Sequence, residues 1–146
     1  MKKSDYILII TLATISILAY FLMRIFLNST NAEDGTAIVY YQDDAILEIY
    51  LLDGTYEILD QDYDIYYAEG EDDNFYYTVP GSGGNEVVIE YKNHQVRVTE
   101  EVSPKHICRI QGWSSSPLSP ITCLPNYLVI VIEADNGDDE PDDITG

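Results

Sequence analysis

An uncharged run of eighteen residues, Tyr6–Met23, is the feature that most constrains this chain. Residues 25–27 continue the apolar run beyond Arg24, whose long side chain can reach toward an interface. Twenty-two helical residues span about 33 Å at roughly 1.5 Å each, which is enough to cross a hydrocarbon core of about 30 Å. The sequence therefore predicts one transmembrane anchor over residues 6–27.

The charges on either side of this segment predict its orientation. Lys2 and Lys3 precede it, whereas Glu33 and Asp34 follow it. Because positive residues favour the cytoplasmic side, residues 1–5 are expected in the cytoplasm and the rest of the chain outside the cell. The predicted location is the cell membrane, crossed once.

A cleaved signal peptide is the alternative interpretation of the same segment. Signal peptides usually have apolar regions of about 7 to 15 residues that end near a small-residue cleavage site. The run here is longer, and the nearest candidate site, the Thr-Asn-Ala of residues 30–32, fits poorly. An uncleaved anchor is therefore favoured.

After a short polar linker over residues 28–36, the hydrophobic pattern changes to a period of two. Ten short runs rich in β-branched and aromatic residues follow, and Asp53-Gly54 between two of them favours a tight hairpin. This pattern predicts an all-β ectodomain over residues 37–134, folded as a small β-barrel or sandwich. The expected strands cover residues 37–41, 45–51, 55–59, 62–67, 75–79, 86–91, 95–99, 107–110, 121–123 and 127–133.

Acidic residues dominate the charge: 26 Asp or Glu against 7 Lys or Arg give a net charge of −19. Such a surface repels phosphate backbones, so no nucleic-acid partner is expected. Between Arg24 and Lys92 there are sixteen acidic residues and no basic one. The last segment, residues 135–146, has no apolar periodicity and is expected to be a disordered acidic tail.

One acidic stretch has part of the spacing of a calcium-binding loop. Asp60, Asp62, Asp64 and Glu71 occupy positions 1, 3, 5 and 12 of an EF-hand-like loop. Such a loop needs glycine at position 6, where Ile65 stands, and the pattern shows no flanking helices. In a strand, the three aspartates would share one solvated face. Weak Ca²⁺ binding is therefore an alternative to a plain acidic surface.

Cys108 and Cys123 are the only two cysteines. Outside the cytoplasm they are expected to form a disulfide, and closing a loop of roughly 15 residues stabilises a fold by about 3 kcal/mol. A redox couple is the alternative, because His106 would share a strand face with Cys108. His94 would complete a set of four zinc-type ligands, but their spacing matches no known zinc motif.

Motifs of the common enzyme classes are missing from the sequence. It contains no P-loop, no dinucleotide-binding glycine motif, no zinc-protease helix motif and no nucleophile elbow. We therefore expect a protein that is not an enzyme and holds no cofactor. Trp113, after Gly112, is expected to pack over the disulfide, with an exposed anchor for a partner as the alternative.

The order of motifs near the C-terminal end resembles a known family. Residues 103–108 (SPKHIC) precede Gly112-Trp113, and residues 123–126 (CLPN) precede a final apolar run. This resembles the NusG domain II family, whose members carry a C-P-x-x-x-C segment, a Gly-Trp pair and a Cys-Leu-Pro-Asn in that order. Ser103 stands where the family pattern has its first cysteine, which speaks against any three-thiol metal or redox role in this chain.

The resemblance implies a compact β-barrel behind one N-terminal transmembrane segment of a bacterial protein. Some anchored members are associated with extracytoplasmic flavin and electron-transfer systems. The expected function is therefore a non-enzymatic accessory or interaction domain with an extracytoplasmic protein partner. The alternatives are a redox accessory of a flavin- or quinone-linked assembly, which would use Cys108 and Cys123, and a weak surface Ca²⁺-binding domain.

Overall fold

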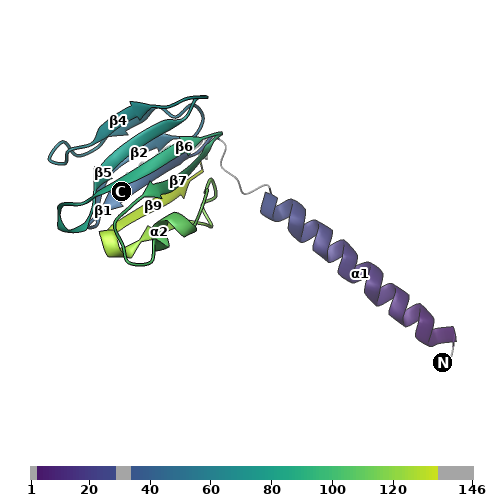
Figure 1. Ribbon diagram of the computed structural model, residues 1–146. Coiled ribbons are helices and arrows are strands. Elements are labelled where there is room, and N and C mark those ends of the chain that lie inside the picture. Colours follow the sequence, from purple (N-terminus) through teal and green to yellow (C-terminus); the bar gives the residue numbers. More distant parts are fainter. Residues whose placement is uncertain (1–2, 29–33, 135–146) are drawn as a thin grey trace, which may run out of the picture. The chain divides into compact units, whose positions relative to one another are not determined.

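The computed structural model describes residues 3–28 and 34–134, which belong to two separate units (Figure 1). The first unit contains the helix α1 (Lys3–Asn28). Its segment Asp5–Ile25 has a mean hydropathy of 2.3, and every side chain in that segment is exposed. A helix of this length and composition is long enough to cross a membrane, and a signal sequence has the same character. The predicted tail over residues 135–146 and most of the predicted linker lie outside the described residues.

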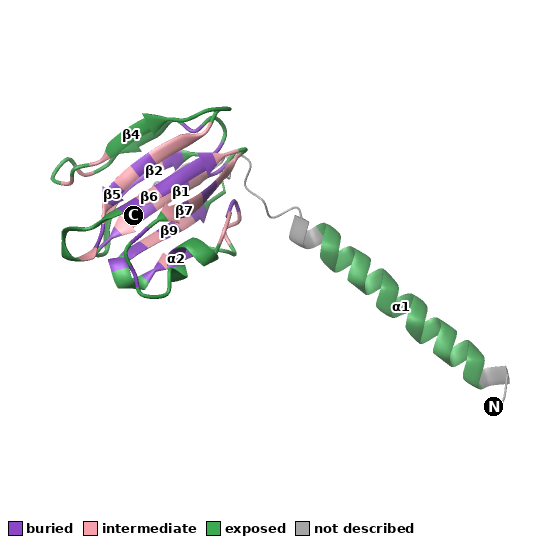
Figure 2. Cartoon of the chain, in the orientation of Figure 1, coloured by how far each residue is buried: buried purple, intermediate pink, exposed green. Residues whose placement is uncertain are grey.

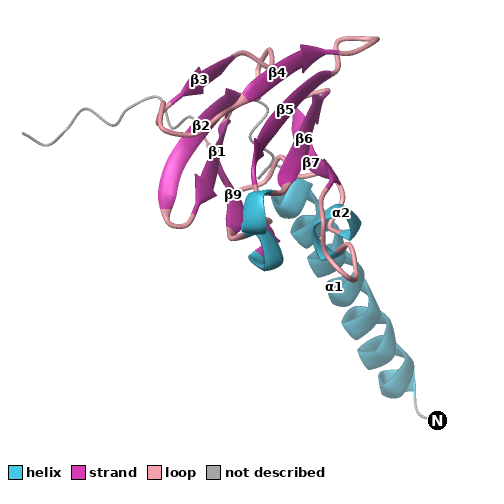
Figure 3. Ribbon diagram, turned by 60° about the vertical axis from the view of Figure 1, so that its left-hand side comes forward, coloured by secondary structure: helices cyan, strands magenta, loops and turns pink. Residues whose placement is uncertain are grey.

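The second unit is built from two antiparallel sheets that pack face to face (Figure 3). One sheet has the order β3-β2-β1-β9-β8 and the other has the order β4-β5-β6-β7. The strands of the first sheet are β1 (Thr36–Tyr41), β2 (Asp44–Tyr50), β3 (Tyr56–Ile58), β8 (Ile121–Cys123) and β9 (Leu128–Glu133). Those of the second are β4 (Tyr66–Glu69), β5 (Phe75–Pro80), β6 (Glu86–Lys92) and β7 (Gln95–Glu100).

The sheets form a sandwich and not the closed barrel that the family resemblance implied. Closure would need hydrogen-bonded pairing of β3 with β4 and of β7 with β8, and neither pair forms within residues 34–134. A physical reason lies in the connections: β3 and β4 are only 3 and 4 residues long, and the segment 101–120 separates β7 from β8. The sandwich alternative is therefore the correct one.

Eight of the ten predicted strands are present, the one expected over residues 62–67 overlaps β4 only at Tyr66 and Tyr67, and the tenth is a short helix. Residues 107–110 form α2 (Ile107–Ile110) because His106 adopts a left-handed conformation and its carbonyl accepts a hydrogen bond from Ile110 N at 3.2 Å. Two 3₁₀ turns, η1 (Ser82–Gly84) and η2 (Leu124–Asn126), complete the elements of this unit. Because α2 is a helix, His106 and Cys108 do not share a strand face, and that expectation was wrong.

Alternation of buried and exposed residues places one face of each sheet in a common core (Figure 2). In β1, for example, every second residue from Ala37 to Tyr41 is buried while the residues between them are partly exposed. Strand β1 pairs with β2 on one side and β9 on the other, which makes it the centre of its sheet. The largest fully buried side chains of the core are Tyr77, Ile46, Leu47, Ile49, Leu51, Ile89, Ile121, Leu128, Ile130 and Ile132.

Three buried tyrosines connect the two sheets through their hydroxyl groups. Each hydroxyl donates a hydrogen bond to a backbone carbonyl in a turn of the opposite sheet, because a buried phenol needs an acceptor. The donor and acceptor pairs are Tyr77 with Gly54, Tyr91 with Leu51 (2.9 Å) and Tyr41 with Gly81 (3.2 Å).

The turn between β2 and β3 contains the glycine that the hairpin prediction required. Gly54 has a φ of +73°, and a Cβ atom there would lie 2.4 Å from the ring of Phe75 and 2.7 Å from that of Tyr91. Both the backbone conformation and the close approach of two rings therefore exclude a larger residue. Asp53 stabilises the same turn, since its carboxylate accepts hydrogen bonds from the backbone N and the hydroxyl of Thr55.

We predict that Tyr77→Phe lowers the free energy of unfolding by about 1–2 kcal/mol, because it leaves the Gly54 carbonyl without its donor. Tyr66→Phe is the matched control, since Tyr66 is 58% exposed. It should change stability by less than about 0.5 kcal/mol. Urea unfolding of the full chain in detergent micelles, followed by circular dichroism, measures both values. Equal effects of the two substitutions would show that the buried hydroxyl does not stabilise the fold.

A second prediction concerns alkaline pH. Burial raises the pKa of the Tyr77 hydroxyl, and also that of Tyr91, above the ordinary value of 10.0. The folded state therefore favours the neutral form of these two phenols. Their contribution to the free energy of unfolding is complete below about pH 10, and it is lost as the pH rises through the folded-state pKa values. A tyrosinate absorbance titration of the folded chain should show late-titrating tyrosines, and stability should fall above about pH 10. Titration of all thirteen tyrosines in one step near pH 10 would contradict this expectation.

Candidate functional site

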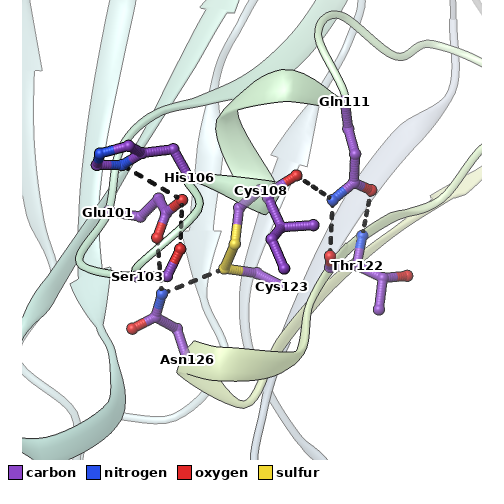
Figure 4. Close-up of a disulfide and its surroundings, with 9 residues drawn as sticks. Glu101, Ser103, His106, Cys108, Gln111, Thr122, Cys123 and Asn126 are labelled. Carbon is purple, nitrogen blue, oxygen red and sulfur yellow. Dashed lines mark hydrogen bonds and ion pairs between the residues drawn. A yellow bond between two sulfur atoms is a disulfide. The ribbon is translucent and has the colours of Figure 1, made fainter.

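A disulfide joins Cys108 of α2 to Cys123 at the end of β8 (Figure 4). The two Cα atoms are 4.9 Å apart, and both residues are fully buried. The bond therefore ties the segment 101–120 to the first sheet. Because both sulfur atoms are buried, a redox partner has no direct access to them in this conformation. The redox role expected as an alternative stays a prediction.

A buried carboxylate lies beside this disulfide. The side chain of Glu101 is 0% exposed and accepts hydrogen bonds from Ser103 Oγ at 3.0 Å and Asn126 Nδ2 at 3.4 Å. The same Asn126 nitrogen lies 3.3 Å from Cys123 Sγ. Within the described residues, the one basic side chain paired with Glu101 is His106, whose Nδ1 lies 3.9 Å from Oε1. We define these five residues together with Cys108 as the disulfide corner.

Sequence reasoning missed Glu101, because it follows Glu100 in a segment that resembles a solvated charge run. The structure leaves Glu100 exposed and buries Glu101. The family motif pointed to Asn126, which is fully buried, but nothing in the sequence linked that amide to a particular carboxylate. His94, the other histidine of the predicted zinc set, places Nδ1 2.8 Å from the carbonyl of Leu51 and does not join the disulfide corner.

The edge of β8 is closed by a side chain. The Nε2 of Gln111 donates a hydrogen bond to the carbonyl of Thr122 at 2.7 Å, and the Oε1 of Gln111 accepts one from the backbone N of Thr122 at 2.9 Å (Figure 4). The amide thus replaces a neighbouring strand. The edge of β7 is closed in a similar way, because Val96 exchanges two backbone hydrogen bonds with Ser114 at 2.8 and 2.9 Å. Both edges near the disulfide are therefore partly covered.

Trp113 is half-buried and lies against the outer side of the second sheet. The guanidinium of Arg97 on β7 stands 4.4 Å from the centre of its ring. That guanidinium also binds Glu90 of β6, with Nη2 2.6 Å and Nε 2.7 Å from the carboxylate oxygen Oε2. Trp113 is thus part of a stack of ring, cation and carboxylate. Its predicted use as a partner anchor is untested.

The opposite side of the sandwich has open edges. Tyr56 of β3 stacks on Tyr67 of β4 with ring centres 4.9 Å apart, and Tyr67 also contacts the rings of Phe75 and Tyr77. All the residues of β3 and β4 are exposed (Figure 2). We define Tyr56–Ile58 and Tyr66–Glu69 as the β3–β4 edge.

The surroundings of the β3–β4 edge are strongly acidic. From Asp53 to Asp73 there are nine acidic residues and no lysine or arginine. The hydroxyl of Tyr67 donates to Glu69 at 3.1 Å. Partial burial and this carboxylate raise the pKa of Tyr67 above its ordinary value. The edge therefore combines exposed rings with a surface of one charge sign.

The residues of the predicted calcium loop are not gathered into one site. Asp60, Asp62 and Asp64 lie in the loop before β4 and not in a strand, because the Asp60 carboxylate accepts a hydrogen bond from Asp62 N at 2.9 Å and turns the chain. Glu71 lies beyond β4. Among the described residues, the one group of three metal-type side chains with ligand atoms within 4.8 Å is Glu101, Cys108 and Cys123. Weak Ca²⁺ binding by the loop stays a prediction.

We predict that the double substitution Cys108→Ser and Cys123→Ser lowers the free energy of unfolding by about 3 kcal/mol, because the unfolded chain regains the freedom of a roughly 15-residue loop. Urea unfolding of the full chain measures the loss. The unsubstituted chain under a reducing agent should show a similar loss, whereas the reducing agent should not affect the double variant. A loss below about 1 kcal/mol would show that the disulfide does not support the fold.

Comparison with known proteins identifies relatives of the fold. No curated protein matches the chain significantly. The solution structure of the Lin0431 protein from Listeria innocua is 24% identical, with a TM-score of 0.54, and the match covers 80% of this chain and 88% of that one. A DUF1312 family protein, EF3258 from Enterococcus faecalis, is 25% identical with a TM-score of 0.44, and the match covers 70% of this chain and 99% of that one. The likeness to Lin0431 shows the fold alone.

The family assignment comes from a sequence profile. The NusG domain II profile matches residues 7–136, which include most of the apolar helix and the whole described β unit. The motifs that carried the resemblance, from Ser103 to Asn126, lie inside this match and surround the disulfide corner. The chain belongs to the NusG domain II family.

Proposed function

We propose that this chain is a non-enzymatic accessory domain, anchored in the cell membrane, that binds an extracytoplasmic protein through the β3–β4 edge. In this proposal α1 crosses the membrane, residues 1–5 lie in the cytoplasm and the β sandwich lies outside. The charges that flank the apolar segment support this orientation. The observation that carries the proposal is the open outer edge of β4 within an acidic, tyrosine-rich surface.

The backbone of β4 supports addition of a further strand. Strand β4 pairs with β5 on one side, and no strand of the described sandwich pairs with its other side. The hydrogen bond from Gly70 N to Asn74 O fixes the alternation along this hairpin, so the amides of Tyr67 and Glu69 point away from β5. Outward amides and carbonyls of an edge strand are a ready template for an extended segment of another protein.

Charge determines what kind of segment fits this edge. A second copy presenting the same edge would bring nine acidic residues against nine others, which is unfavourable. A lysine- or arginine-rich strand would instead be attracted. Tyr66, which is 58% exposed, offers a ring face to its cations. The proposed occupant is therefore a basic, extended segment of an extracytoplasmic protein.

A strand-length peptide that alternates lysine and threonine tests the proposal. With the full chain in nanodiscs, the peptide should shift the backbone amide NMR signals of Tyr66–Glu69 and their neighbours, and high salt should weaken the binding. The matching glutamate–threonine peptide should not bind. Glu69→Pro should weaken binding by roughly tenfold or more, because it removes an outward amide at a position where an edge strand tolerates proline.

Glu69→Gln is the matched control, because it removes the charge and keeps the amide. It should weaken binding only slightly. Equal losses of peptide affinity in the proline and glutamine variants would show that the peptide is held by charge attraction and not by strand addition. Shifts spread over the whole acidic surface, or binding that follows self-association of the chain, would overturn the proposed edge.

A further inference from the structure

We propose that the reduced form of this chain binds one Zn²⁺ ion through Cys108, Cys123, Glu101 and His106. Opening the disulfide would thus convert the disulfide corner into a metal site. This inference goes beyond the proposed docking function and does not rest on it, because the two involve different residues on different elements.

Three of the four proposed ligand atoms lie close together, and the fourth, on His106, lies beside one of them. One carboxylate oxygen of Glu101 and the sulfur atoms of Cys108 and Cys123 lie within 4.8 Å of one another, and all three residues are buried. His106 Nδ1 lies 3.9 Å from the Glu101 carboxylate. Two thiolates, an imidazole and a carboxylate are a donor set that suits tetrahedral zinc. The site differs from the set that the sequence suggested, because Glu101 takes the place of His94.

The charge of this corner favours a cation. A buried carboxylate is costly unless a cation or sufficient hydrogen bonds compensate it. Glu101 receives hydrogen bonds from two neutral groups, on Ser103 and Asn126, and within the described residues no lysine or arginine pairs with it. Two thiolates formed beside it would add two negative charges. A divalent ion would offset two of these three negative charges.

The side chain of His106 does not cap α2 and lies beside Glu101 instead. His106 is the N-cap residue of α2 and has a left-handed backbone conformation, with φ 49° and ψ 41°. Its side chain makes no capping hydrogen bond there. Instead the imidazole lies beside Glu101 (Figure 4), and 63% of the side chain is exposed. The exposed imidazole therefore gives an ion a route from solvent to the buried ligands.

The proposed chemistry has two steps. A dithiol reductant first transfers two electrons and two protons to the Cys108–Cys123 disulfide, which gives two thiols, and the reductant itself becomes a disulfide. Zn²⁺ then displaces the two thiol protons into water, and both sulfur atoms bind the ion as thiolates. Glu101 and His106 supply the remaining two ligands without any change of oxidation state.

Zinc titration of the full chain in micelles, before and after reduction, tests the proposal. The reduced chain should bind one Zn²⁺ per chain, keep its β-sheet circular dichroism and gain melting temperature on binding, whereas the oxidised chain should bind none. Co²⁺ in place of Zn²⁺ should give a sulfur-to-metal charge-transfer band and tetrahedral d–d bands. Glu101→Gln and His106→Asn should each weaken zinc binding by roughly tenfold or more.

Matched variants separate ligation from folding. Asparagine accepts the left-handed conformation of His106 but does not replace the imidazole, and this exposed site should tolerate it even if Glu101→Gln unfolds the chain. Glu100→Gln, at the exposed neighbour, should leave the affinity unchanged. Equal affinity in His106→Asn and the unsubstituted chain, zinc binding by the oxidised chain, or a fall in melting temperature with zinc would each overturn the proposal.

Discussion

Buried tyrosine hydroxyls that need hydrogen-bond acceptors fix how the two sheets of this domain fit together. Tyr77 and Tyr91 of one sheet reach carbonyls in the turn between β2 and β3 of the other, and Tyr41 reaches back in the opposite direction. Apolar burial alone is non-directional and would allow the sheets to slide. The hydroxyls specify the arrangement, because a slipped sheet would leave buried polar groups unsatisfied. The position of β3, and with it the ring stack on β4, follows from this turn.

The strand edges are covered on one side of the sandwich and open on the other. On one side, Gln111 and Ser114 satisfy the backbone edges of β8 and β7, and the disulfide holds the covering segment in place. On the other side, β4 pairs with β5 but no strand of residues 34–134 pairs with its outer side, which lies in an acidic surface. Charge protects such an edge from self-association while leaving it open to a basic strand. This contrast is the reason for assigning binding to one side and stability to the other.

Errors of sequence interpretation fall where the hydrophobic pattern predicts a strand but the backbone turns instead. Residues 107–110 are apolar enough for a strand, yet the left-handed His106 starts a helical turn there. Asp60 and Asp62 alternate as in a strand, yet a local hydrogen bond turns the chain at this point. In both places a short run of residues is compatible with two conformations, and a local hydrogen bond accompanies the one that forms.

The sequence by itself determined the apolar helix, the positions of eight strands, the tight turn at Gly54 and the pairing of the two cysteines. Periodicity, turn chemistry and a cysteine pair are local or unambiguous properties, so no knowledge of the fold is needed to interpret them. Tertiary structure alone decided that the sheets stay open, that Glu101 is buried while Glu100 is exposed, and that His106 instead of His94 lies beside Glu101. Those outcomes depend on contacts between residues far apart in the chain, and the burial of a single charged residue leaves no periodic trace in the sequence.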